Sequence, residues 1–189
     1  MLGSVAEEVV RHAPCPVVTV GRGAVAPEAM EGGTMLVPVD FSEHRSRLLA
    51  HALEIAPVYG MDVTVLHVVE LKGVPDAYGL YSSLPDPGKL ADQAKDALAE
   101  DVEAMEAAGV DVSISVRSGH PADQILTAAE ETEAAFITIA THGRTGMDRM
   151  LMGSVAEKVI RQAPCPVCTV KSFGQSFVEE DESEADVSA

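Results

Sequence analysis

Residues 151–170 read LMGSVAEKVIRQAPCPVCTV. Within this stretch Ser154–Gln162 predicts a helix, and the apolar run Val167–Val170, which follows two prolines, predicts a strand. Helices that lead into short apolar strands are the units from which α/β domains are built. The stretch therefore predicts that the chain ends an α/β domain here.

The same alternation of strand and helix extends back to Thr34. Short apolar or β-branched runs predict strands over Met35–Val39, Val63–Val69, Val110–Val116 and Phe136–Ala140. Apolar residues at helical spacing predict helices over Leu48–Ala56, Leu90–Met105 and Pro121–Ala129. Residues 71–88 contain several helix or strand breakers, among them Gly73, Pro75, Pro85 and Pro87, and predict an irregular connection. We expect an α/β fold with a doubly wound five-stranded parallel sheet in the order 3-2-1-4-5 and helices on both faces.

The beginning of the chain repeats its end. Residues 1–20 read MLGSVAEEVVRHAPCPVVTV, which matches residues 151–170 at 14 of 20 positions without a gap. Such a match is an internal repeat. We interpret residues 1–20 as an orphan helix–strand unit of a missing second domain, left by descent from a tandem pair or by a start codon placed too far downstream. The alternative is an independent helix–strand appendage.

Composition divides the rest of the chain. Residues 21–33 form a Gly/Pro/Ala linker, residues 34–171 the one complete domain, and residues 172–189 an acidic, Ser-rich tail that we expect to be disordered. Apolar residues make up 47% of the 189, which suffices for one core. No apolar run approaches the roughly 18 residues of a membrane span, and no secretory signal is seen, so we expect a cytoplasmic protein without membrane contact.

The chain is strongly acidic, with a net charge of −17. Only 6 of its 30 acidic residues lie after Lys171, so the folded part is acidic as well. This charge argues against nucleic acid as a partner, because phosphate backbones bind basic surfaces. The chain has only five lysines. We interpret the composition as adaptation to a high-salt cytoplasm, where a Debye length of about 3 Å at 1 M salt weakens self-repulsion.

Catalytic and metal sites are not indicated by the sequence. Cys165 and Cys168 have the spacing of a redox or zinc-binding pair, but they follow a helix rather than open one, and the repeat has Val18 in place of the second cysteine. We expect these cysteines to be structural. His67 lies in an apolar strand and is expected to be a core histidine. No Ser/His/Asp set, acid–base pair or metal cluster emerges, so we predict no catalytic residue and no metal ligand.

One segment does indicate binding chemistry. Ala140-Thr141-His142-Gly143 ends the fourth strand, and after nine more residues Gly153-Ser154 begins the last helix. In the expected strand order the loop containing Asp40 and the loop of Thr141–Gly146 meet where the strand order reverses, which is where open α/β sheets bind ligands. Glycines let backbone amides approach an anion, and a helix N-terminus favours negative charge. Ser154 either caps its helix in a capping box with Glu157 or donates its hydroxyl to a phosphate.

These motifs resemble the universal stress protein domain over about Thr34–Val170. ATP-binding members of that family carry Gly-x-x-Gly, nine residues, and then Gly-Ser or Gly-Thr. This chain has Ala140 at the first glycine and keeps the remainder of the motif. The resemblance also includes residues 37–42 (VPVDFS), 66–69 (LHVV), 119–121 (GHP) and 163–167 (APCPV).

The resemblance implies a nucleotide site. Asp40 would face the adenosine end of ATP, with Pro38 and Val68 lining the adenine. The loop of Ala140, Thr141 and His142 would lead to the phosphates. The backbone of six residues would hold these phosphates and any Mg²⁺ that accompanies them: Gly143, Arg144, Gly146, Gly153, Ser154 and Val155. For Asp40 the alternative is a carboxylate that caps the turn after its strand, and for Val68 it is a core position.

The resemblance also implies a function. We expect an ATP-binding stress-response module that changes protein partners or oligomeric state, with at most slow ATP hydrolysis. The alternative is a family member that binds no nucleotide and works only through protein contacts. Domains of this family commonly pair through their last strands, which implies a homodimer or a pseudo-dimer. Pro16–Val20 would then lie beside Val167–Val170 of its own or another chain.

Overall fold

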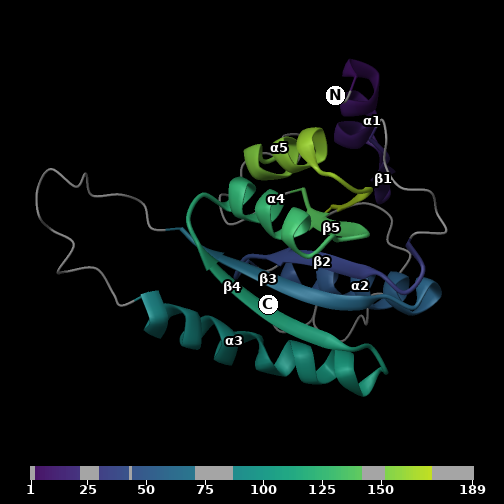
Figure 1. The fold of residues 1–189 in the computed structure, drawn as a ribbon. Coiled ribbons are helices and arrows are strands. Elements are labelled where there is room, and N and C mark those ends of the chain that lie inside the picture. Colours follow the sequence, from purple (N-terminus) through teal and green to yellow (C-terminus); the bar gives the residue numbers. More distant parts are fainter. Residues whose placement is uncertain (1–2, 22–29, 43, 71–86, 142–151, 172–189) are drawn as a thin grey trace, which may run out of the picture.

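The computed structural model describes residues 3–21, 30–42, 44–70, 87–141 and 152–171, and structural statements below concern these residues. Their helices and strands form one sheet with helices on both faces (Figure 1). Most of the linker and the whole acidic tail lie outside the described residues. No described helix is long and apolar enough to cross a membrane.

The sheet contains six described strands in the order β1-β6-β5-β2-β3-β4. Their bounds are β1 Val17–Thr19, β2 Thr34–Val39, β3 Asp62–Val69, β4 Val112–Ser118, β5 Phe136–Ala140 and β6 Val167–Val170. Strands β2 to β6 are parallel and follow the predicted order, so the α/β fold is confirmed. The prediction of five strands is one too few, because β1 pairs antiparallel with β6 and extends the sheet.

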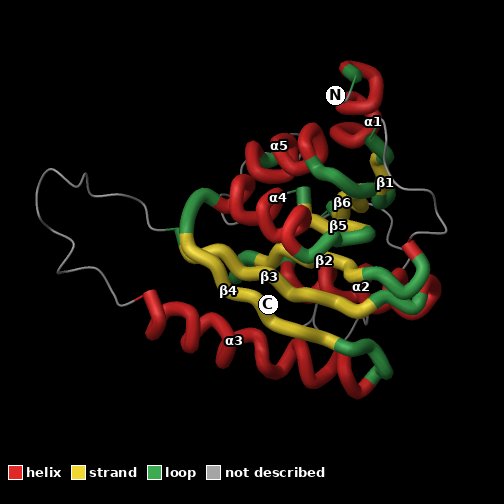
Figure 2. The backbone as a smooth tube through the Cα atoms, viewed as in Figure 1, coloured by secondary structure: helices red, strands yellow, loops and turns green. Residues whose placement is uncertain are grey.

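The helices divide between the two faces of the sheet (Figures 1 and 2). Their bounds are α1 Ser4–His12, α2 Arg45–Tyr59, α3 Pro87–Ala107, α4 Pro121–Glu131 and α5 Ser154–Gln162. Residues of α2 and α3 form one core with Met35, Val37 and Val39 of β2. Residues of α4 and α5 form the other core, which includes Leu36 of β2 and Val10 of α1. The alternating side chains of the central strand thus supply both cores.

Most predicted elements agree with the structure, and β5, α5 and β6 have the predicted bounds. Helix α3 begins at Pro87, inside the segment that we expected to be irregular, since proline is well suited to a first helical turn. Strand β4 begins at Val112 rather than Val110. Val110 is instead buried after the turn at Gly109, whose φ of 86° favours glycine.

Candidate functional site

The carboxyl ends of β2 and β5 form the candidate site. These two central strands pair in parallel, with Met35 opposite Phe136 and Leu36 opposite Ile137. The chain leaves β2 towards β3 on one side and leaves β5 towards β6 on the other. The strand order therefore reverses between β2 and β5, and the residues that follow each strand emerge at the same edge of the sheet. Asp40 follows β2, and Thr141 follows β5.

Asp40 organises the turn after β2. Its Oδ1 accepts hydrogen bonds from the backbone amide of Ser42 at 3.3 Å and from the Ser42 hydroxyl at 2.6 Å. This is the local arrangement by which an aspartate stabilises a turn two residues further on. The turn-capping role that the sequence left open for Asp40 is therefore present. The carboxylate is half-buried at the edge where β2 ends.

His67 supports the same turn from β3. Its Nδ1 lies 3.0 Å from the carbonyl oxygen of Val39, so Nδ1 carries the proton, because a carbonyl only accepts. The imidazole also contacts the Phe41 ring, with 4.4 Å between the ring centroids. The Arg45 guanidinium lies over the Phe41 ring, with its central carbon 5.6 Å from the ring centroid. The Nε of Arg45 also pairs with a carboxylate oxygen of Asp101 at 3.1 Å.

The role of His67 differs from the expected core histidine. Its side chain is half-buried, and it joins β3 to the residue that precedes Asp40. The sequence analysis also missed Phe41, which is 39% exposed beside this imidazole. The sequence places Phe41 next to Asp40, but its contact with His67 depends on the pairing of β2 with β3.

Backbone hydrogen bonds join both ends of the loop that follows β5. The amide of Thr141 donates to the carbonyl of Val170 at 2.9 Å, and the amide of Gly153 donates to the carbonyl of Thr141 at 2.9 Å. A Cβ atom on Gly153 would lie 3.3 Å from that Thr141 oxygen, which is a tight contact. Glycine at 153 therefore permits the close approach, and its amide is already used inside the protein.

The structure does not show the capping-box alternative for Ser154 at the start of α5. Gly153 occupies the N-cap position, and Ser154 is the first helical residue, so its hydroxyl stands one position too late to cap. The Glu157 carboxylate instead pairs with Arg161 at 3.0 Å. The first bond of the helix runs from the Glu157 amide to the Gly153 carbonyl. The amides of Ser154, Val155 and Ala156 precede it and have no intrahelical acceptor.

The other predicted site residues divide into two groups. Pro38 and Val68 are half-buried on neighbouring strands, and Val68 packs against the core formed with α4 and α5. Ala140 is half-buried at the end of β5 with a negative φ, so its backbone does not require glycine. The remaining predicted residues lie outside the described residues: His142, Gly143, Arg144 and Gly146.

The two cysteines of the CxxC pair are buried in different cores. Cys165 packs in the core with α4 and α5, whereas Cys168 packs in the core with α2 and α3. Burial raises the pKa of the Cys165 thiol to about 11 and that of Cys168 to about 12. Reactive cysteines need the opposite shift, because the thiolate is the nucleophile. The arrangement agrees with the structural role expected for this pair.

Comparisons with known proteins agree with this geometry. The model of the universal stress protein family matches residues 33–171. A universal stress protein of Methanocaldococcus jannaschii is 34% identical over 142 residues, which cover 72% of this chain and 81% of that protein. The crystal structure of a universal stress protein from Archaeoglobus fulgidus superposes with a TM-score of 0.67 at 29% identity, covering 90% of this chain and 56% of that one.

A further solved structure has the same fold. It is a universal stress protein in complex with cAMP, 22% identical, with a TM-score of 0.52 and coverage of 75% of this chain and 98% of that one. The family match spans the strands and helices that position Asp40, Thr141 and Gly153. The chain belongs to the universal stress protein family.

Proposed function

We propose that this chain binds an adenine nucleotide, ATP, at the edge between β2 and β5 and acts as a stress-response regulatory module. The observation that carries the proposal is the start of α5. Three amides without intrahelical acceptors, those of Ser154, Val155 and Ala156, lie directly after Gly153, which is bonded to the residue that follows β5. A helix N-terminus next to a reversal of strand order favours a phosphate.

The remaining groups fit the other end of the nucleotide. Pro38 and Val68 offer apolar side chains on adjacent strands for the adenine, and Asp40 lies at the adenosine end. The amides at the start of α5 and the exposed Ser154 hydroxyl would bind the phosphates. Mg²⁺ would be carried mainly by the phosphate oxygens, as is usual for ATP sites. The complex of a family member with cAMP supports an adenine nucleotide as the ligand class.

The alternative function is a family member that works through protein contacts without nucleotide. Two observations favour it. The Gly153 amide already donates to Thr141, and Oδ1 of Asp40 already accepts two hydrogen bonds from Ser42. Both groups would therefore bind a nucleotide only through their remaining capacity or after rearrangement.

Equilibrium binding distinguishes the two functions. ATP with Mg²⁺ is titrated into the chain in high salt by calorimetry, with cAMP as a second ligand. We expect binding of ATP, and loss of about tenfold in affinity for Ser154→Ala, since one hydrogen bond to a charged group contributes about 1.4 kcal/mol or more. A folded chain that binds no ATP at millimolar concentration would support the protein-contact alternative.

The repeat supplies a matched control for the phosphate end. Gly153 and Gly3 are the N-cap residues of α5 and α1, with similar extended backbones. A Cβ on Gly153 would press on Thr141, whereas a Cβ on Gly3 would meet nothing within 4 Å. We expect Gly153→Val to abolish ATP binding and Gly3→Val to leave it unchanged. Equal affinities for both variants would contradict the proposed site.

A further inference from the structure

Helix α2 begins with residues that are unusual at the start of a helix. Its first turn reads Arg-Ser-Arg-Leu over 45–48, and the N-cap residue His44 makes no side-chain capping hydrogen bond. A helix N-terminus favours acidic side chains, because the backbone dipole is positive there. Arg45 at the first helical position therefore needs compensation from another part of the fold. This position lies shortly after Ser42, which closes the turn that Asp40 organises.

Helix α3 supplies this compensation. The Nε of Arg45 lies 3.1 Å from Oδ2 of Asp101, and both side chains are largely buried. Asp101 is on the face of α3 that enters the core, since it stands one turn from Leu98 (0% exposed) and one turn from Met105 (3% exposed). Its Oδ2 is buried and accepts no hydrogen bond from the described residues, so its contact with Arg45 is electrostatic. A buried carboxylate oxygen is costly without a counter-charge, and the Arg45 guanidinium provides one.

Arg45 also holds the turn of residues 40–42. Its guanidinium carbon lies 5.6 Å from the centroid of the Phe41 ring, within the range of a cation–π contact. Its backbone amide donates to the carbonyl of Ser42 at 3.2 Å. A second support comes from β3, because the His67 ring contacts the same Phe41 ring. The turn is thus held from β3 and from the start of α2.

We propose that Asp101 is a positioning residue for the nucleotide site: through Arg45 it fixes the turn that presents the Asp40 carboxylate. The inference rests on the proposed function for the identity of the ligand, whereas the fixing of the turn is a property of the chain alone. Without the Asp101 charge, the guanidinium would stand at the positive end of α2, where the helix dipole disfavours it. The turn would lose one of its two supports, and a nucleotide would have to order it on binding.

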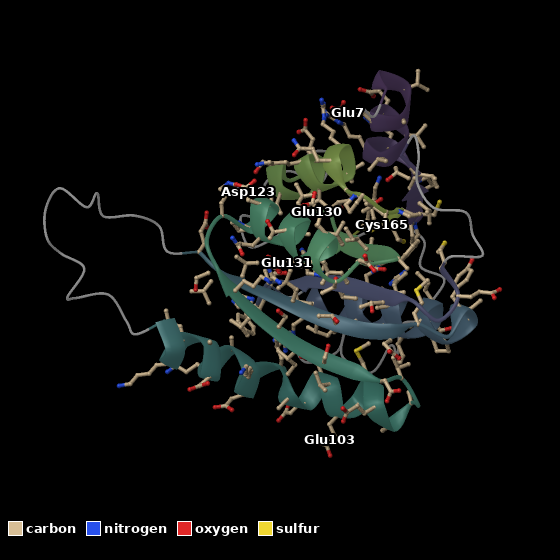
Figure 3. The ribbon with its side chains drawn as sticks, viewed as in Figure 1. Glu7, Glu103, Asp123, Glu130, Glu131 and Cys165 are labelled. Atoms are coloured by element: carbon tan, nitrogen blue, oxygen red, sulfur yellow. The ribbon has the colours of Figure 1, made fainter. Side chains whose placement is uncertain are left out.

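The test compares two substitutions on α3 of the full-length chain. Asp101→Asn removes the charge and keeps the size of the side chain. Glu103→Gln makes the same chemical change at an exposed position, which Figure 3 shows on the outer side of α3. The first measurement is the NMR order parameter of the Ser42 amide without nucleotide. We expect it to fall from about 0.85 to about 0.6 in Asp101→Asn and to stay unchanged in Glu103→Gln. Equal order parameters in the parent and both variants would overturn the proposal.

The second measurement is the affinity for ATP with Mg²⁺ by calorimetry. We expect a loss of about tenfold for Asp101→Asn and no change for Glu103→Gln, because only the first substitution adds an ordering cost to binding. A parent chain that binds no ATP would refute the proposed function, and the Ser42 order parameter would still decide whether Asp101 fixes the turn. A parent and an Asp101→Asn chain that bind ATP equally well would overturn this inference alone.

Arg45→Gln separates action through Arg45 from a general loss of stability. If Asp101 acts through Arg45, adding Asp101→Asn to the Arg45→Gln chain should change neither the Ser42 order parameter nor the ATP affinity further. Fully additive effects of the two substitutions would overturn the proposal. If Asp101→Asn prevents folding, Arg45→Lys decides, because lysine keeps a counter-charge for Asp101 but lacks the planar group that lies over Phe41. Arg45→Lys should also lower the Ser42 order parameter, and an unchanged value would refute the proposal.

Discussion

Val9 and Val159 offer a paired test of what tertiary packing contributes. They occupy equivalent positions in α1 and α5, but Val9 is 51% exposed whereas Val159 is 0% exposed. Val159→Ala removes two buried carbon groups, each contributing about 0.8 kcal/mol of transfer free energy. With the cavity left behind, we expect a loss of about 2–3 kcal/mol in the free energy of unfolding. Val9→Ala should change it by less than about 0.5 kcal/mol, because surface substitutions rarely do more.

Thermal unfolding followed by circular dichroism measures both effects. For a domain of this size about 1 kcal/mol corresponds to about 2–4 °C, so Val159→Ala should lower Tm by about 4–12 °C and Val9→Ala by no more than about 2 °C. The two substitutions are chemically identical and lie in helices of nearly the same sequence. Helix propensity therefore cancels in the comparison. Equal losses for the two variants would refute the reasoning, since Val9 would then have to be buried as Val159 is.

Three further predictions concern charge and protonation. Because burial raises the pKa of Cys165 to about 11 and of Cys168 to about 12 from 9.0, the folded chain retains protons that the unfolded chain releases. The contribution of each thiol to the free energy of unfolding should be constant below about pH 9 and then fall by about 1.4 kcal/mol per pH unit as the pH rises towards those values. Urea unfolding from about pH 9 upwards, with a Cys168→Ser control, measures this fall, and a flat profile would contradict it. The chain has a net charge of −17, so its acidic groups repel one another in the folded state. Raising the salt from about 0.1 M to about 1 M shortens the Debye length from about 10 Å to about 3 Å, and the urea midpoint of unfolding should therefore rise. An unchanged midpoint would show that self-repulsion does not affect stability. The Lys158 hydrogen bond lowers the pKa of Asp123, which Figure 3 shows on α4, below 3.8. Lys158→Ala should therefore raise the Asp123 pKa in an NMR titration, and an unchanged value would show that the pair does not form in solution.

Local sequence patterns predicted the elements of the complete domain because the patterns match the geometry of each element. Apolar runs of four to seven residues ended at the same residues as β5 and β6, where alternating side chains face two cores. Boundaries failed where one residue suits two conformations. Pro87 reads as a breaker in a loop but equally well begins α3, and Val110 continues the apolar run of β4 but packs after a turn.

The candidate site was predicted only in part. Glycine and serine at the start of α5 indicated an anion site, and their place at the end of the loop after β5 follows from the order of elements. The capping-box alternative for Ser154 failed because the helix begins at Ser154, one residue earlier than the motif requires, with Gly153 as its N-cap. The support that His67 gives to the Val39 carbonyl was missed, because it joins residues of two strands whose register the sequence does not state.

The two copies of the repeat separate what sequence and tertiary structure each determine. The shared sequence by itself determined that both segments form a helix followed by a strand, because apolar periodicity and the proline break are local properties. Only the tertiary structure decided their environments. Cys168 is 1% exposed between β5 and β1, whereas its counterpart Val18 is 53% exposed at the outer strand of the sheet. Burial depends on neighbours brought from distant parts of the chain, and no local pattern contains that information.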